Sequence, residues 1–139
     1  MWSVEARARE VDVAVEAASW AGLLEESVLA LAHVVRSGDG ERSPMRRMRK
    51  IALPAGDETA VWRAWWAGLL ALLRDERVLP CSAGIRPDST PAETHTVVRC
   101  VPIDARRGEL VLPRSLAIEH TSARATPGGR AGVARLVLP

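Results

Sequence analysis

Apolar residues recur at helical spacing along the first part of the chain and predict a helix over residues 2–36. Its first stripe consists of Val4, Ala8, Val11, Val15 and Ala18. The helical spacing of this stripe is interrupted near residues 19–22, because Glu25 and Glu26 stand at the positions where apolar residues should follow. It resumes as Trp20, Leu24, Val28, Leu31 and Val35. Two alternatives stay open, namely one long helix whose buried side rotates midway, or two helices with a break near Gly22.

A further helix is predicted over residues 58–77, with Asp57 as its N-cap. Three of the chain's five tryptophans fall on one side of it at spacing i, i+3, i+4, and leucines continue the apolar surface. A partner protein would contact this tryptophan helix through one apolar set of residues, namely Trp62, Trp65, Trp66, Leu69 and Leu73. Between positions 60 and 73 the only charged residue is Arg63. Because a helix that is apolar nearly all round must be covered on more than one side, we expect it between layers or shared with a partner.

The connector between these helices is basic. Ser43 and Pro44 have the order of an N-cap followed by proline at the first helical position, which predicts a short helix over residues 44–51. Residues 41–50 carry one acid and five bases, a net charge of +4, whereas residues 1–40 carry seven acids and three bases, a net charge of −4. The bases of this basic segment are Arg42, Arg46, Arg47, Arg49 and Lys50.

Beyond residue 93 the pattern changes from helical spacing to alternation, which is typical of strands. Residues 81–91, rich in proline and small polar residues, are predicted to be a loop. The predicted strands and turns are a strand over 94–103, a turn over 104–108, strands over 109–112 and 115–121, a hairpin loop over 125–132, and a strand over 133–138.

These elements together predict a single α+β domain over residues 1–139. Its helical half (1–79) consists of a long first helix, the short basic helix and the tryptophan helix, and a loop (80–93) leads to the β half (94–139). An antiparallel meander of three or four strands has one face to cover, and the tryptophan helix is the expected cover. The long first helix would then pack on the outer side of the tryptophan helix.

The composition fits a globular domain and narrows its setting. A chain of 139 residues is long enough for one real core. Arginine outnumbers lysine 18 to one, which indicates a GC-rich coding sequence and therefore a bacterium or a phage. The charged N-terminus lacks the apolar stretch of a signal peptide, and the longest apolar run, residues 64–73, is far short of the ~20 residues that span a bilayer. We therefore expect a cytoplasmic protein with reduced thiols and no membrane contact.

The tryptophan helix allows two interpretations. Apolar helical stripes are usually core, and here the helix would lie between the first helix and the sheet. Tryptophan is also enriched at the centres of protein interfaces, where its truncation costs the most affinity. A mixed arrangement, with Trp62 and Trp66 inside and Trp65 at a homodimer interface, satisfies both.

The basic segment is the candidate for nucleic-acid contact. Arginine forks match phosphate oxygens, and clustered bases release counterions when they meet a nucleic acid. The alternative is a solvated surface that pairs with acids of the first helix such as Glu10, Asp12 or Glu16. Without Phe or Tyr a base-stacking platform is not expected, so contact would be with backbone phosphate of RNA or DNA.

We predict no metal, no cofactor and no catalytic site. Cys81, His95, Cys100 and His120 are separated by 13, 4 and 19 residues, so none of them forms the close pair typical of zinc sites. The alternative is a Cys100–His120 nucleophile pair on adjacent strands, oriented by Glu119 or Asp104. However, Cys100 is expected within a strand, where nothing lowers its pKa.

The function predicted from these patterns is a non-catalytic protein–protein interaction or assembly subunit of a bacterial or phage complex. It would self-associate, or dock on a larger complex, through the apolar tryptophan helix. The alternative is a nucleic-acid-binding accessory protein that contacts phosphates through residues 42–50.

Overall fold

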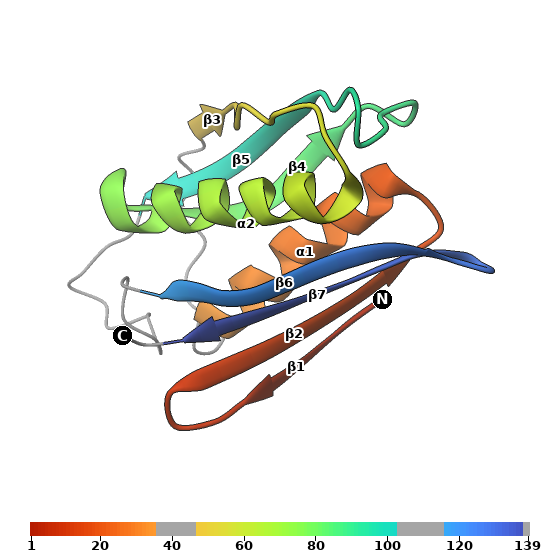
Figure 1. Ribbon diagram of the computed structural model, residues 1–139. Helices are drawn as coiled ribbons and strands as arrows, with labels where there is room; N and C mark the ends of the chain where they lie inside the picture. The colour runs from red at the N-terminus through yellow and green to blue at the C-terminus, as the bar shows by residue number, and fades with distance from the viewer. Residues whose placement is uncertain (36–46, 103–115, 138–139) are drawn as a thin grey trace.

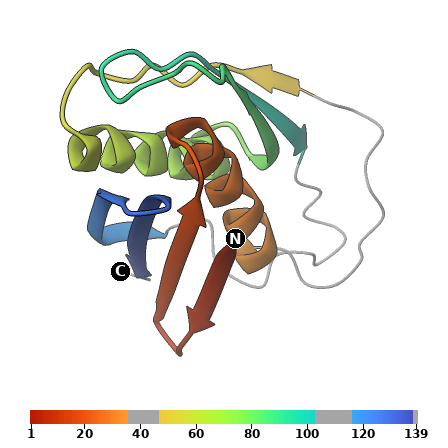
Figure 2. The ribbon, with the colours of Figure 1, turned by 90° about the vertical axis from the view of Figure 1, so that its right-hand side faces the viewer.

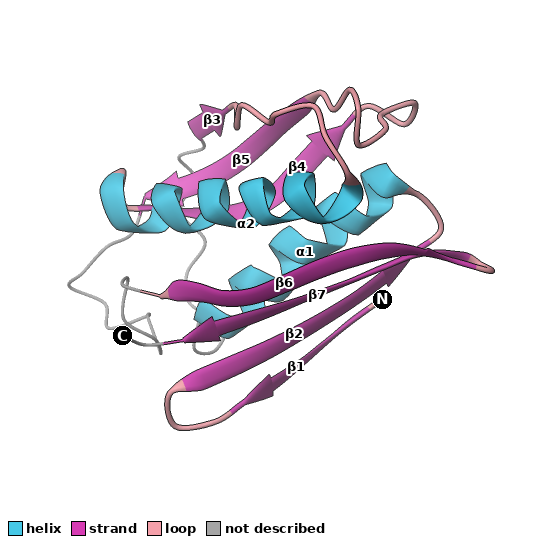
Figure 3. Cartoon of the chain, in the orientation of Figure 1, coloured by secondary structure: helices cyan, strands magenta, loops and turns pink. Residues whose placement is uncertain are grey.

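The computed structural model describes residues 1–35, 47–102 and 116–137, and every structural statement below concerns these residues. Figure 1 shows the arrangement of the elements, and Figure 3 distinguishes helices from strands. In chain order the elements are β1 (Trp2–Ala6), β2 (Glu10–Ala17), α1 (Trp20–Val35), β3 (Arg47–Arg49), α2 (Glu58–Asp75), β4 (Val78–Ile85), β5 (Thr96–Pro102), β6 (Ala117–Thr126) and β7 (Gly129–Val137).

Two antiparallel sheets enclose a layer of two helices (Figures 1 and 2). The large sheet has the strand order β1-β2-β7-β6, and the small sheet has the order β3-β5-β4. Helix α1 packs on β1 and β2 of the large sheet and on β4 of the small one, while α2 packs on β6 and β4. The helices therefore have a sheet on each side, which explains how both can be apolar over much of their circumference.

The predicted helix over residues 2–36 is wrong for residues 2–17, which form the hairpin β1–β2. Val11, Val13 and Val15 are buried against the helices, while the residues between them point outwards. This is the period of two that a half-buried strand requires, and β-branched valine favours that conformation. Of the first apolar stripe, Val11 and Val15 fit both helical spacing and a period of two, and the structure has the period of two. From Trp20 to Val35 the prediction of helix is confirmed.

The predicted fold, helices first and one meander last, is therefore wrong. Within the described residues, two helices lie between two antiparallel sheets, and the first strands of the chain belong to the same sheet as the last ones. The long first helix does not cover the outside of the tryptophan helix either, since α1 and α2 share one layer.

Two local predictions also need correction. Residues 47–49 of the predicted basic helix form the short strand β3 on the edge of the small sheet, and residues 44–46 lie outside the described residues. The predicted loop over 81–91 is a strand as far as Ile85, because a register shift between Pro80 and Ser82 lets β4 pair with β5 despite the proline.

The tryptophan helix and several strands are confirmed. Helix α2 begins after Asp57, whose carboxylate accepts a hydrogen bond from the Ala60 amide at 2.9 Å. Strand β5 lies within the predicted 94–103, and residues 117–121 and 133–137 are strand as predicted. The hairpin loop predicted over 125–132 shrinks to the turn at Pro127 and Gly128. The strand predicted over 109–112 and the turn over 104–108 lie outside the described residues.

The core lies on both sides of the helix layer. Four of the five tryptophans are buried in it, and only Trp2, on the edge strand β1, stays half-buried. Neither helix in the described part of the chain is long and apolar enough to cross a membrane.

Candidate functional site

The residues proposed for a tryptophan-helix interface lie inside a single copy of the chain. Trp62, Trp65, Trp66 and Leu69 are 0% exposed and Leu73 is 3% exposed. Trp65 donates its indole N–H to the Ser27 hydroxyl of α1 at 2.7 Å, and Trp62 donates to the Val133 carbonyl of β7 at 2.9 Å. Because these hydrogen bonds and this burial are made within one chain, a partner has to be contacted through other residues.

The basic segment is only partly described. Arg42 and Arg46 lie outside the described residues. Arg49 donates to the Glu76 carboxylate at the end of α2, with 2.7 Å between Nε and Oε1. Arg47 and Lys50 are exposed to solvent. The described part of the segment therefore offers two exposed cations and one that is engaged in an ion pair.

The structure does not bring Cys100 and His120 together. Cys100 is fully buried in β5 of the small sheet, whereas His120 is exposed on β6 of the large sheet, beyond the helix layer. Burial, together with the neighbouring Cys81, raises the pKa of the Cys100 thiol to about 11, which keeps the thiol protonated. His95 lies in another place again, 3.1 Å from the Glu93 carboxylate. Glu119 is on β6 with His120, and Asp104 lies outside the described residues.

The outward face of the large sheet carries a groove that the sequence analysis did not identify. The helices cover one face of this sheet, and the described residues leave the other face open (Figure 2). The groove on the open face has a volume of about 570 Å³. This large-sheet groove is lined by residues from all four strands, namely Ser3, Val4, Glu5, Asp12, Val13, Ala14, His120, Val133, Ala134 and Arg135.

Small side chains form the floor of the groove. Ser3 of β1 is paired with Ala14 of β2, and Ala14 is paired with Val133 of β7, so a row of short side chains runs across three strands. Val133 is 40% exposed, a large value for a branched apolar residue. Since none of these side chains reaches far above the sheet, space remains above them, beside the row of longer polar residues Glu5, Asp12, Arg135 and His120.

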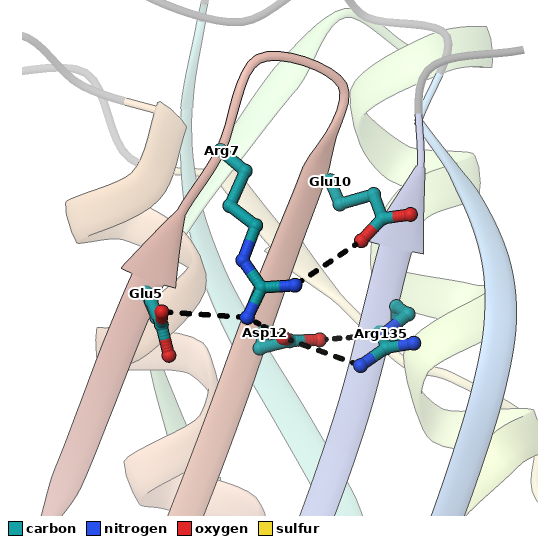
Figure 4. A network of polar contacts seen from close by, with 5 residues as sticks. All are labelled: Glu5, Arg7, Glu10, Asp12 and Arg135. Atoms are coloured by element: carbon teal, nitrogen blue, oxygen red, sulfur yellow. Dashed lines mark hydrogen bonds and ion pairs between the residues drawn. The ribbon is translucent and has the colours of Figure 1, made fainter.

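A network of ion pairs holds the polar side of the groove in place (Figure 4). Arg135 of β7 binds the Asp12 carboxylate with two nitrogens, at 2.7 and 3.4 Å. Arg7 lies 3.4 Å from Glu5, 3.7 Å from Glu10 and 3.8 Å from Asp12. The hydrogen bond from Arg135 lowers the pKa of Asp12 below its ordinary value, because it stabilises the ionised carboxylate.

The groove combines this fixed charge pair with an apolar floor and a histidine. His120 is the residue of β6 that pairs with Arg135, so the imidazole and the guanidinium come from neighbouring positions of adjacent strands. Local sequence patterns could not show this, because Asp12 and Arg135 are separated by 123 residues. The strict alternation in β2 was the one available signal, since it places Asp12 and Ala14 together on the face opposite the buried valines.

Comparison with protein-family models gave no match for this chain, and comparison with curated proteins gave none either.

Proposed function

We propose that the chain is a non-catalytic protein-interaction subunit that receives a segment of a partner protein in the large-sheet groove. The groove itself is the observation that carries this proposal. Its volume of about 570 Å³ lies in the range of ligand-binding sites, and its lining comes from all four strands of an outward face. A broad hollow of this kind fits several side chains of another protein.

The distribution of polar and apolar groups supports the same function. Protein interfaces combine an apolar centre with a polar rim. Here Ala14 and Val133 lie on the floor, and Glu5, Asp12, Arg135 and His120 form a polar row across the four strands along one side of it. Because the charged pair is already formed, a partner would meet a prepared rim without first ordering it.

A non-catalytic role agrees with the state of the one cysteine considered as a nucleophile. Cys100 is buried and protonated, and its sheet is not the one that carries the groove. We place this subunit in the cytoplasm of a bacterium, or in a phage assembly, as a component of a larger complex.

The proposal is tested by affinity purification of the tagged chain from the cells that naturally contain it. Val133→Lys puts a long charged side chain on the floor of the groove while leaving the main-chain carbonyl that Trp62 uses. Met48→Lys is the matched control, because Met48 is 52% exposed on the small sheet. We expect a co-purifying protein to be lost with Val133→Lys and kept with Met48→Lys. Equal recovery with both variants contradicts the proposal.

A second candidate function, contact with nucleic-acid phosphates, rests on three exposed bases of the small sheet. Arg47 and Lys50 are exposed at β3, and Arg99 is exposed on the adjacent β5. The test is binding of an RNA and a DNA oligonucleotide across a salt series. Affinity should fall steeply with salt and be lost in Arg47→Glu/Lys50→Glu/Arg99→Glu, but not in Arg63→Glu on α2. Unchanged affinity in the triple variant would remove this candidate.

A further inference from the structure

The free edge of β1 is the least protected strand edge of the described structure. Edge strands present unpaired N–H and C=O groups, and proteins normally shield them with proline, bulges, shortness or charge. At the other edges, β4 contains Pro80 and a register shift, β6 has a register shift between Ile118 and His120, and β3 is three residues long with Arg47 at its start. The β1–β2 register has no shift, and β1 contains no proline.

The hydrogen bonds of β1 show which main-chain groups are unpaired. Met1 exchanges two hydrogen bonds with Glu16, and the Arg7 amide donates to the Glu10 carbonyl at 2.8 Å. In an antiparallel pair such bonds occur at every second residue, so the odd positions of β1 bond to β2. The N–H and C=O groups of Trp2, Val4 and Ala6 therefore point away from β2, towards the free edge.

An exposed apolar surface lies beside this edge. The rings of Trp2 and His33 are 4.9 Å apart, and the Met1 amine is 3.5 Å from the Glu26 carboxylate, so one side of α1 adjoins β1. Leu29 is three residues after Glu26 and four before His33, which places it on that same side. Leu29 is 43% exposed and Met1 is 85% exposed. Met1 and Leu29, two of the most exposed large apolar residues of the described chain, thus lie near Trp2, the only tryptophan that is not fully buried.

The sequence of β1 is complementary to itself. If two copies pair antiparallel with Val4 opposite Val4, then Trp2 lies opposite Ala6, and Ser3 lies opposite Glu5. The large side chain of Trp2 lies opposite the small one of Ala6, and Glu5 lies opposite Ser3, so no like charges are directly opposite each other.

We propose that β1 pairs antiparallel with β1 of a second copy of this chain around a twofold axis at Val4, which joins two large sheets into one continuous sheet. The exposed side of α1, with Leu29, then packs against the same side of α1 in the second copy beneath the joined strands. A twofold contact of this kind uses the same patch twice and closes at the dimer. The large-sheet groove opens on the face away from the helices, and Ser3, Val4 and Glu5 of β1 line one end of it, so the second copy would lie beside the groove without filling it.

The test measures the mass of the purified full chain by light scattering and analytical ultracentrifugation over a wide range of concentration. The wild type should approach twice 15.0 kDa. Val4→Pro removes an edge N–H that β2 does not use, so the dimer should weaken about tenfold or more. Leu29→Asp should weaken it by about as much through the helix contact. Val133→Lys, in the groove, should leave the dimer unchanged.

Amide hydrogen exchange provides a reading without any substitution. In the dimer the Val4 amide should be as protected as those of Ser3 and Glu5, and on dilution to monomer it should exchange much faster while theirs stay protected. A wild type that remains a monomer at every concentration overturns the proposal, as does a dimer insensitive to both Val4→Pro and Leu29→Asp. A dimer lost in Val133→Lys also overturns it, because the copies would then meet through the groove.

Discussion

The hydrogen bond between Trp65 and Ser27 gives the most direct test of the helix layer. Both residues are 0% exposed, and the Ser27 hydroxyl accepts from the Trp65 indole at 2.7 Å while donating to the Leu24 carbonyl at 2.6 Å. Ser27→Ala leaves a buried indole N–H without its partner, which costs about 1–3 kcal/mol. We expect the free energy of unfolding, measured with urea, to fall by that amount with an unchanged denaturant slope.

A double-mutant cycle separates this bond from general packing. Trp65→Phe removes the donor, so Ser27→Ala should cost much less in that background, and the coupling energy should be about 1–3 kcal/mol. Trp66→Phe is the matched control, because Trp66 is equally buried and its N–H has no partner in the described structure. Coupling of Ser27 to Trp66 should stay within about 0.5 kcal/mol. Equal coupling to both tryptophans, or a cost of Ser27→Ala near zero, refutes the reasoning.

Three further predictions concern other parts of the fold. Gly132→Ala places a Cβ 2.7 Å from the ring of Trp62, and this overpacking should lower the free energy of unfolding by about 1–3 kcal/mol in urea. Asp57→Ala removes the cap of α2 and should cost about 1 kcal/mol by the same measurement. Because the pKa of Cys100 rises from 9.0 to about 11 in the folded chain, the unfolded thiol ionises first as pH increases. Stability should therefore fall by about 2–3 kcal/mol between those pH values in the wild type but not in Cys100→Ala. An unchanged free energy of unfolding in Gly132→Ala or in Asp57→Ala would contradict the prediction for that residue. The Cys100 prediction fails if Cys100→Ala shows the same loss of stability with pH as the wild type.

The sequence identifies α2 because its local signals agree. Asp57 supplies a cap, the next eighteen residues contain no proline, and the apolar positions follow helical spacing without interruption. The sequence also indicates that α2 is buried on two sides, because a helix that is apolar nearly all round must pack against neighbours on more than one side. What covers it depends on residues far away in the chain, which is why a partner and a second layer could not be distinguished from the sequence.

The N-terminal strands could have been predicted and were not. Val11, Val13 and Val15 alternate with Asp12 and Ala14, a period of two, but Val4, Val11 and Val15 also fit a helical stripe. The β propensity of valine favours a strand for this segment, and the pairing of β2 with β7 stabilises the strand further. The alternation in β2 indicates only that Asp12 and Ala14 share a face, and the groove could not have been predicted from it, because its ion pair and its floor exist only once β2 and β7 are side by side.

The pairing of β2 with β7 sets the order in which the core can close. Asp12 and Arg135, which meet across this pair, are 123 residues apart, so the large sheet is incomplete until the chain between them has been made. Until then the hairpin β1–β2 lacks its inner neighbour, and α1 and α2 keep apolar surface in water. Long-range pairing of this kind slows folding, because the loop must close before the contacts form. Chains in which β7 has not yet joined the sheet should therefore be prone to aggregation.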